Sequence, residues 1–248
     1  MLANERQVKI LNIVNDKKNI SVSELKKLLN ISESTIRRDL SYLNSQNKLV
    51  KVHGGAACVQ NFFTAEEADI ATKKTLNIEQ KKLIGKRAAA LIKENDFVYI
   101  DAGTTAETMT EYINQKKAVY ITNGIETAKK LAQKGFNVNI ICGRLKKGTE
   151  AIVGGEAVKL IKNYHFTLGF FGTNGINLKT GFTTPDIEEA SVKEQAVKNC
   201  RNSYILADSD KLNKITAVSF AALESSVIIT VKCAETDIFK KRTVILEV

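Results

Sequence analysis

Residues 30–56, NISESTIRRDLSYLNSQNKLVKVHGGA, join an amphipathic helical pattern to a basic strand that leads into two glycines. Three apolar side chains of the helical part fall on one side of a helical wheel, which predicts a buried stripe. These are Ile36, Leu40 and Leu43. The opposite face holds Ser34, Arg37, Arg38 and Ser41. We therefore expect the two adjacent arginines to point away from the core, where they can meet phosphates and base edges.

The residues before this helix predict another helix and a tight turn. Ser21 and Glu24 have the spacing of a capping box, which marks a helix start. The helix that follows should present one apolar face, made of Leu25, Leu28 and Leu29. Asn30 suits a left-handed helix end, and Ser32 suits the cap of the next helix. With a first helix expected over residues 6–14, the pattern is a helix-turn-helix.

After the arginine-bearing helix, residues 48–56 alternate apolar and basic side chains toward Gly54 and Gly55. This pattern is typical of a strand that enters a tight hairpin, so the simplest interpretation is a winged helix-turn-helix with its third helix in the DNA major groove. The candidate DNA-binding residues are Ser34, Thr35, Arg37, Arg38, His53, Gly54 and Gly55. Asp39 should instead pair with a basic neighbour, because its carboxylate would be repelled by phosphates.

The distribution of charge favours a polyanionic partner. The formal net charge is +10 over 248 residues, and residues 1–60 hold ten Lys and Arg against five Asp and Glu. A quarter of the chain thus carries half of the excess, as expected for a nucleic-acid-binding segment. A general preference for lysine on the surface is the alternative, and it explains the second half of the chain better than the first.

Cysteine and histidine usage argues against metal sites and disulfides. The four cysteines are far apart and form no Cys-x-x-Cys motif, and His53 and His165 are the only histidines. We expect no metal and no other cofactor. The N-terminus is charged, and no stretch approaches the ~18 apolar residues of a membrane helix. The sequence therefore predicts a cytoplasmic protein with reduced thiols and no membrane partner.

Beyond residue 76 the pattern alternates between strands and helices. The candidate strands are 97–101, 118–123, 138–142, 166–172, 203–208 and 227–231. Helices are expected from Asn77, over 126–134 and over 188–199, the first with Ile84, Ala88, Leu91 and Ile92 on its inner face. Continuous apolar strands between helices predict an α/β fold with a mostly parallel sheet covered on both faces. The expected domains are a winged helix-turn-helix (1–58), a connector packing in part through Phe62 and Phe63 (59–75), and an effector-sensing α/β domain (76–248).

Small polar residues follow the predicted strands, and ligands of open α/β sheets bind beyond the carboxyl ends of strands. The segment Gly103-Thr104-Thr105 precedes a helix and could seat a phosphate, while carboxylates could accept from sugar hydroxyls and basic side chains could add charge. The candidate residues for a small phosphorylated polyol are Asp101, Gly103, Thr104, Thr105, Thr122, Asn123, Arg144, Gly172, Thr173, Asp208 and Lys211.

These residues allow two other interpretations. Gly, Thr, Asn and Asp also serve as turn and cap residues in any α/β domain, although five clusters at successive strand ends favour a site. Gly143 to Gly148 has the spacing of a Walker A loop, but Thr149 occupies the lysine position, and no Gly-x-Gly-x-x-Gly follows a strand. We interpret residues 143–148 as a basic turn.

Several of these motifs together resemble the DeoR family of bacterial sugar-metabolism repressors, over nearly the whole chain. The motifs are TIRRDL (35–40), HGGA (53–56), DAGTT (101–105), GTNG (172–175) and ADS (207–209). The resemblance implies a winged helix-turn-helix joined to a sensor domain whose fold is shared with ribose-5-phosphate isomerases and glucosamine-6-phosphate deaminases. It also implies a phosphorylated sugar as effector. Residues 181–186, GFTTPD, are similar to the fructose-operon repressor branch, which implies fructose 1-phosphate, with other sugar phosphates open.

The chain departs from the related enzymes at their catalytic positions. The isomerases place acidic residues where this chain has Gly172 to Gly175, and the deaminases place a catalytic histidine where it has Ile176. The resemblance therefore implies a repressor without catalytic residues, whose partners are operator DNA, a sugar phosphate and further copies of itself in a dimer or tetramer. Two alternatives stay open: a sugar-phosphate isomerase or deaminase with an accessory DNA-binding head, and a regulator of opposite sign, either an activator or one using its effector as co-repressor.

Overall fold

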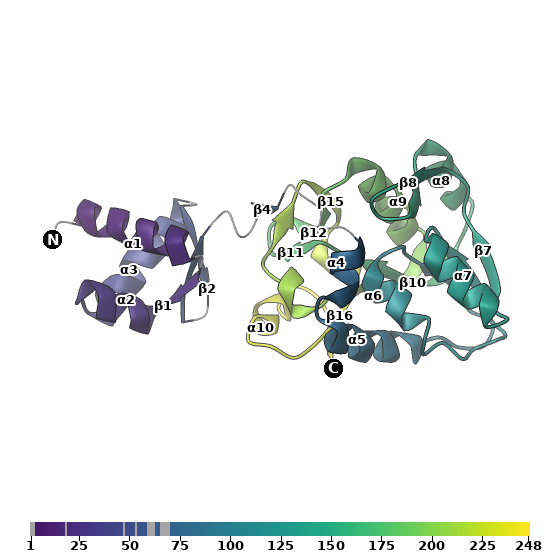
Figure 1. Cartoon of the computed structure of the whole chain (residues 1–248), viewed down its shortest axis with the longest axis horizontal. Coiled ribbons are helices and arrows are strands. Elements are labelled where there is room, and N and C mark those ends of the chain that lie inside the picture. The colour runs from purple at the N-terminus through teal and green to yellow at the C-terminus, as the bar shows by residue number, and fades with distance from the viewer. Residues whose placement is uncertain (1–2, 18, 47, 53, 59–62, 65–69) are drawn as a thin grey trace. The chain divides into compact units, whose positions relative to one another are not determined.

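The structure is a computed structural model that describes residues 3–17, 19–46, 48–52, 54–58, 63–64 and 70–248. The chain divides into two compact units, Met1–Thr64 and Ala65–Val248, which we call the N-terminal and C-terminal units (Figure 1). In the N-terminal unit the structure describes α1 (Ala3–Lys17), β1 (Asn19–Ser21), α2 (Val22–Leu29), α3 (Glu33–Ser45), β2 (Leu49–Val52), β3 (Gly55–Cys58) and β4 (Phe63–Thr64).

The N-terminal unit is a helix-turn-helix with a three-stranded sheet. The strand order is β1-β3-β2, and both pairings are antiparallel. The predicted helix signals are confirmed: Ser21 and Glu24 form the capping box of α2, Asn30 ends α2 in the left-handed region, and Ser32 caps α3. The pairing of β1 with β3 was not predicted, because a three-residue strand carries too little pattern.

The apolar stripe of α3 forms the centre of the N-terminal core. Ile36, Leu40 and Leu43 are all buried, as predicted, among side chains of α1, α2 and the sheet. The prediction for Leu28 is wrong, since its side chain is 53% exposed. The eight-residue α2 buries Val22 and Leu25 instead, which turns Leu28 toward solvent.

A seven-stranded sheet forms the centre of the C-terminal unit. Its order is β17-β16-β13-β10-β5-β6-β7, and every pairing is parallel. The strands are β5 (Phe97–Ile100), β6 (Val119–Thr122), β7 (Asn137–Ile140), β10 (Phe166–Gly172), β13 (Cys200–Leu206), β16 (Val227–Thr230) and β17 (Ile245–Glu247). All six predicted strands are present, and β17 is an addition at the edge.

Helices cover both faces of this sheet, as the continuous apolar strands predicted. They are α4 (Ile70–Thr75), α5 (Ile78–Ala89), α6 (Thr104–Met109), α7 (Ile125–Gln133), α8 (Gly155–Ile161), α9 (Ile187–Lys198) and α10 (Thr236–Phe239). One core contains side chains of α5, α6 and α7 with Val98 and Phe170 of the sheet. The other contains side chains of α8 and α9 with Tyr99 and Phe171, because successive strand residues face opposite sides.

Further short elements surround the main sheet and were not predicted. A hairpin joins β8 (Arg144–Lys146) to β9 (Ala151–Val153), and a small antiparallel sheet joins β11 (Gly175–Asn177), β12 (Gly181–Thr184) and β15 (Val218–Ala221). The remaining elements are β14 (Ile215–Thr216) and the 3₁₀ helices η2 (Ser209–Lys211) and η3 (Leu223–Ser225). The predicted basic turn at 143–148 is therefore wrong: residues 144–146 are strand β8, and the turn begins at Lys147.

The predicted connector, 59–75, contains the helix α4. Phe62 lies outside the described residues, as does the side chain of Phe63, so the expectation that they pack stays a prediction. Within the described ranges, no helix is long and apolar enough to cross a membrane. In the same ranges, no cluster of three His, Cys, Asp or Glu side chains could hold a metal ion.

Candidate functional site

The outer face of α3 is the candidate DNA-binding surface. Ser34, Arg37 and Arg38 are exposed, and Thr35 is partly exposed. The Ser32 hydroxyl accepts from the Thr35 backbone N–H at 3.3 Å, which fixes the first turn of the helix. The guanidinium of Arg37 lies 3.8 Å from the exposed carboxylate of Glu33, which is a weak contact. Both guanidinium groups thus project from the surface with N–H donors available for a ligand, as DNA recognition requires.

Asp39 lies on the same helix but faces α1. Its side chain is buried, and Arg6 donates to it from Nε at 2.5 Å and from Nη2 at 3.2 Å. The hydrogen bond to Asp39 raises the pKa of Arg6 above its ordinary value. The prediction that Asp39 pairs with a basic neighbour is therefore confirmed, and the pair fixes α3 against α1.

The wing hairpin turns at Gly54, whose φ of +78° is a left-handed conformation that favours glycine. Gly55 is buried, and a Cβ atom there would lie 2.2 Å from the Ile20 carbonyl oxygen. Its small size is needed for β1 to approach β3, which is a structural reason for the second glycine of the motif. His53 lies outside the described residues, so its role stays a prediction.

A pocket opens at the carboxyl ends of the parallel strands in the C-terminal unit. Its volume is about 820 Å³, including its open mouth. Nine of the predicted effector residues line it: Asp101, Gly103, Thr104, Thr105, Asn123, Gly172, Thr173, Asp208 and Lys211. They come from the ends of β5, β6, β10 and β13 and from the start of α6. The sheet therefore brings together residues that are up to 110 positions apart.

Several predicted residues use their polar groups to build the pocket wall. The Asp101 carboxylate accepts from the Gly172 N–H at 3.0 Å and from the ammonium of Lys193, which also donates to the Gly172 carbonyl. Asn123 accepts from the Ala102 N–H at 2.9 Å. The Thr173 hydroxyl donates to the backbone. These contacts fix the relative positions of the strand ends.

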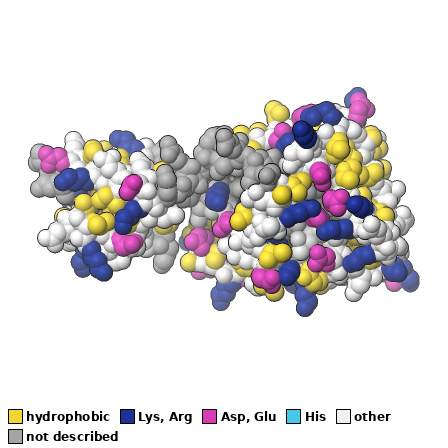
Figure 2. All heavy atoms as spheres, viewed as in Figure 1, with side chains coloured by type: hydrophobic (Ala, Val, Ile, Leu, Met, Phe, Trp, Pro, Cys, Tyr) yellow, Lys and Arg dark blue, Asp and Glu magenta, His cyan; other side chains and the backbone are white. Residues whose placement is uncertain are grey.

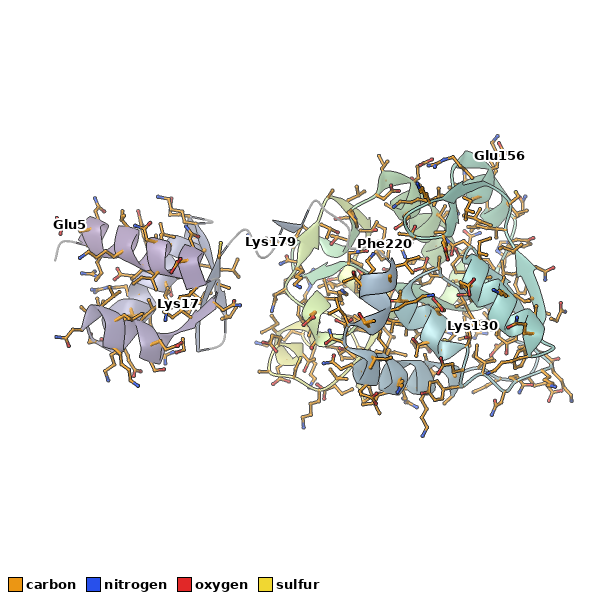
Figure 3. The ribbon with its side chains drawn as sticks, in the orientation of Figure 1. Glu5, Lys17, Lys130, Glu156, Lys179 and Phe220 are labelled. Carbon is orange, nitrogen blue, oxygen red and sulfur yellow. The ribbon has the colours of Figure 1, made fainter. Side chains whose placement is uncertain are left out.

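Asp101 and Lys193 form a compensated pair. Both side chains are almost fully buried, and the Lys193 ammonium also lies over the ring of Phe220, which is labelled in Figure 3. The negative charge of Asp101 is therefore committed to Lys193. Oδ2 of Asp101 accepts the hydrogen bonds from both Gly172 and Lys193, so a sugar hydroxyl would have to donate to Oδ1.

Lys81 and Lys211 give the pocket positive charge. Among the described residues, neither ammonium has a carboxylate oxygen within 4.0 Å. Burial lowers the pKa of Lys81, while the charge of Asp208 opposes this and that of Lys211 adds to it. Figure 2 shows basic and acidic side chains interspersed on the visible face of the C-terminal unit.

The lining also holds Glu189, whose carboxylate is part of a hydrogen-bond network. It accepts from the Thr149 hydroxyl at 2.6 Å and from the Lys146 ammonium at 3.0 Å. Thr184 of the GFTTPD motif lies 3.3 Å from its second oxygen, and Asp186 of the same motif caps α9 by accepting from the Glu189 N–H. The motif thus supports one wall of the pocket.

The structure does not bring Thr122 and Arg144 into the described pocket lining, so their predicted roles stay predictions. The Thr122 side chain is fully buried, and its hydroxyl accepts from the Gly124 N–H at 3.0 Å to shape the turn after β6. The Arg144 side chain is exposed on β8 and pairs with Glu188. Arg144 was predicted to follow a strand end directly, but it begins a hairpin strand instead.

Sequence reasoning missed Lys81, Lys193, Glu189 and α4, all of which contribute to the lining. A signal for Lys81 was available, because it lies three residues before Ile84 and seven before Ala88, on the buried side of α5. Lys193 likewise falls on the buried side of α9, between Ala190 and Val197. A charged residue inside an apolar helix face is costly unless it has a partner or a ligand, so it marks a candidate site.

A helix-turn-helix unit joined to an α/β unit with a polar pocket defines a ligand-responsive DNA-binding regulator. Residues 6–62 match the model of the DeoR-like helix-turn-helix domain, and residues 76–232 match that of the DeoR C-terminal sensor domain. The chain belongs to the DeoR family of transcriptional regulators, which confirms the resemblance found in its sequence motifs.

Individual relatives are similar over nearly the full chain. A transcriptional regulator named FruR from Bacillus subtilis is 37% identical, covering 99% of this chain and 98% of its own. A lactose phosphotransferase system repressor from Staphylococcus aureus is 34% identical over 90% of this chain and 89% of its own. Among solved structures, ribose 5-phosphate isomerase from Methanocaldococcus jannaschii is 15% identical over 55% of each chain, with a TM-score of 0.40.

Proposed function

We propose that this protein represses a sugar-utilisation operon and that fructose 1-phosphate, bound in the C-terminal pocket, releases it from operator DNA. The observation that carries the proposal is the composition of the pocket lining. The hydroxyls of Thr104 and Thr105 and the ammonium groups of Lys81 and Lys211 are suited to a phosphate. Carboxylates at the same pocket, including Asp208, are suited to sugar hydroxyls.

The first turn of α6 adds backbone donors to this phosphate seat. The helix begins at Thr104, so the N–H groups of its first turn have no acceptor within the helix. The first intrahelical bond runs from the Glu107 N–H to the Gly103 carbonyl at 2.8 Å. A phosphate at this position would meet amides, hydroxyls and lysines together, which is a stronger combination than any of them alone.

The choice of fructose 1-phosphate has two supports. The GFTTPD motif, residues 181–186, supports the pocket wall through Thr184 and Asp186, so it lies where it can affect selectivity. The Bacillus subtilis relative carries the name FruR. Repression rather than activation is supported by the name of the Staphylococcus aureus relative, a lactose phosphotransferase system repressor.

The DNA-binding role is assigned to α3 and the wing. Ser34, Thr35, Arg37 and Arg38 would contact the major groove, while His53, Gly54 and Gly55 would shape the wing against the DNA backbone. One helix offers few base contacts, each worth roughly 1–3 kcal/mol if bidentate. We therefore expect a dimer or tetramer that binds repeated half-sites.

The effector acts through a coupling between the pocket and the DNA-binding units. Couplings of this kind are typically about 1–3 kcal/mol, so saturating effector should weaken operator binding roughly 5- to 150-fold. The protein is proposed to act without catalysis. Ile176, at the position of the deaminase histidine, is buried in the core and away from the pocket lining.

A gel-shift titration of the purified protein on its promoter fragment tests the proposal. We expect fructose 1-phosphate to weaken operator binding, and fructose 6-phosphate and glucose 6-phosphate to act only at much higher concentration. Tighter binding with effector would reverse the proposed sign. No response to any sugar phosphate would contradict the effector site. Turnover of ribose 5-phosphate or glucosamine 6-phosphate would favour the enzyme alternative.

A further inference from the structure

Among the described elements of the C-terminal unit, the short helix α4 comes first in the chain. It lines the pocket with Ile70 and Lys73, and none of its residues is buried. Only residues 65–69 separate it in sequence from the N-terminal unit. A helix of six residues without a buried apolar face is held by its polar contacts, so its stability should respond to changes in them.

Two lysine contacts attach α4 to neighbouring helices. The Lys81 ammonium of α5 donates to the main-chain carbonyl of Lys73, close to the C-terminal end of α4. A positive group is favourable at a helix C-terminus, where carbonyl groups lack intrahelical partners. The Lys74 ammonium of α4 lies 3.1 Å from the Glu107 carboxylate of α6, which also binds Lys130 of α7, labelled in Figure 3.

Lys81 has donors to spare. Its side chain is 3% exposed, and among the described residues the Lys73 carbonyl is its one hydrogen-bond partner. An ammonium has three donors, so two remain for a ligand in the pocket that Lys81 lines. Lys193 differs, because its charge is compensated by Asp101. Within the part of the chain that the structure describes, Lys81 is therefore a buried lining cation without a carboxylate within 4.0 Å.

We propose that Lys81 is a positioning residue that couples the pocket to α4, because its ammonium binds the phosphate of a ligand and the Lys73 carbonyl at the same time. The ligand's negative charge offsets the repulsion that the Lys81 ammonium experiences from Lys73 and Lys211. Ligand binding thereby fixes α4. This inference rests on the proposed function for the ligand class and adds the route of its effect.

Hydrogen–deuterium exchange of the full-length protein tests the coupling, with fructose 1-phosphate and inorganic phosphate as probes. In the parent we expect saturating probe to slow exchange about tenfold in two segments, 103–107 at the pocket floor and 70–77 at α4, a size typical of effector coupling. In Lys81→Met the slowing at 103–107 should persist at higher probe concentration, while the slowing at 70–77 is lost. Operator release should be lost with it.

Lys82→Met is the matched control on the same helix. Its ammonium is exposed and pairs with Glu79 at 2.8 Å, away from the pocket lining, so this variant should behave as the parent does. Lys81→Arg, which keeps the charge, should recover part of the slowing at 70–77.

The outcomes separate this inference from the proposed function. Equal slowing at 70–77 in the parent and in Lys81→Met overturns the coupling, as does slowing confined to 103–107 in the parent. A response to inorganic phosphate without one to fructose 1-phosphate contradicts the proposed effector. The coupling is then judged by comparing the slowing at 70–77 in the parent and in Lys81→Met with inorganic phosphate as the probe. A parent that responds to neither probe contradicts both proposals.

Discussion

The Arg6 guanidinium donates from Nε and Nη2 to the Asp39 carboxylate, at 2.5 and 3.2 Å, and thereby fixes α3 against α1. Asp39→Ala would leave the largely buried Arg6 charge without its partner. We expect the free energy of unfolding of the N-terminal unit to fall, because the Arg6 guanidinium would lose both of its hydrogen bonds to Asp39. Urea unfolding of the full chain followed by circular dichroism measures this.

Glu33→Gln on the same helix is the control for Asp39→Ala. The Glu33 carboxylate is exposed and lies 3.8 Å from Arg37, so its loss should cost less than about 1 kcal/mol. If the two variants unfold at the same urea concentration, the Arg6–Asp39 pair does not carry the stability assigned to it.

Arg37→Ala and Arg38→Ala should each abolish or strongly weaken operator binding while leaving unfolding cooperative, since both side chains are exposed. Losing a base contact should cost roughly 1–3 kcal/mol and relax sequence preference, whereas losing a phosphate contact should mainly reduce the salt dependence. Lys9→Ala, an exposed lysine of α1, is the control. Fluorescence anisotropy with labelled promoter DNA at several salt concentrations distinguishes the cases. Parent-like affinity in both arginine variants would show that α3 is not the docking helix.

The two wing glycines should respond differently to alanine. At Gly54 a Cβ meets open space, so Gly54→Ala carries only the left-handed backbone strain, about 1–2 kcal/mol. At Gly55 the Cβ would lie 2.2 Å from the Ile20 carbonyl, so Gly55→Ala should separate β1 from β3 and cost more. Thermal unfolding of both variants tests the order. A larger loss in Gly54→Ala would mean that the β1–β3 contact is not a close one.

Much of the fold was predictable because its signals are local. The stripe of Ile36, Leu40 and Leu43, the capping box at Ser21 and the apolar strands of the parallel sheet each occupy a short stretch of sequence. The small sheet of β11, β12 and β15 was missed because residues 218–221 pair with a segment more than 30 positions earlier. No local pattern encodes such a pairing.

The candidate site was predictable to the extent that it consists of strand ends. Parallel strands bring their carboxyl ends to one edge, so Asp101, Gly172 and Asp208 were identified together. Lys81 and Lys193 come from helix interiors, where their apolar neighbours on the same face indicate burial but not which pocket they line. Their place at the pocket depends on how α5 and α9 pack on the sheet, which is a tertiary property.

Thr104→Ala and Lys211→Ala should leave operator binding intact and weaken the response to fructose 1-phosphate, because both residues line the pocket. Loss of one charged hydrogen bond to phosphate should raise the effector concentration needed by about 10- to 100-fold. Arg144→Ala is the control, since Arg144 pairs with Glu188 outside the described lining. Gel shifts across an effector titration give all three values. A parent-like response in both pocket variants would place the phosphate elsewhere.

Effector binding should also weaken at alkaline pH because of Lys81. Burial lowers its pKa below the ordinary 10.5, and only the ammonium form attracts phosphate. Affinity should therefore be highest below the folded pKa of Lys81 and fall as the pH rises through it, at a pH below 10.5. The phosphate is already dianionic there, since its second pKa is about 6. Over the window between the folded and ordinary pKa values the unfolded chain binds more protons, so the contribution of Lys81 to the free energy of unfolding rises with pH.

Isothermal titration with fructose 1-phosphate from neutral pH to about pH 10 measures the pH dependence of the affinity. The alkaline fall in affinity should be absent in Lys81→Met and present in Lys82→Met. Matching profiles in the parent and Lys81→Met would mean that the Lys81 ammonium does not contact the ligand.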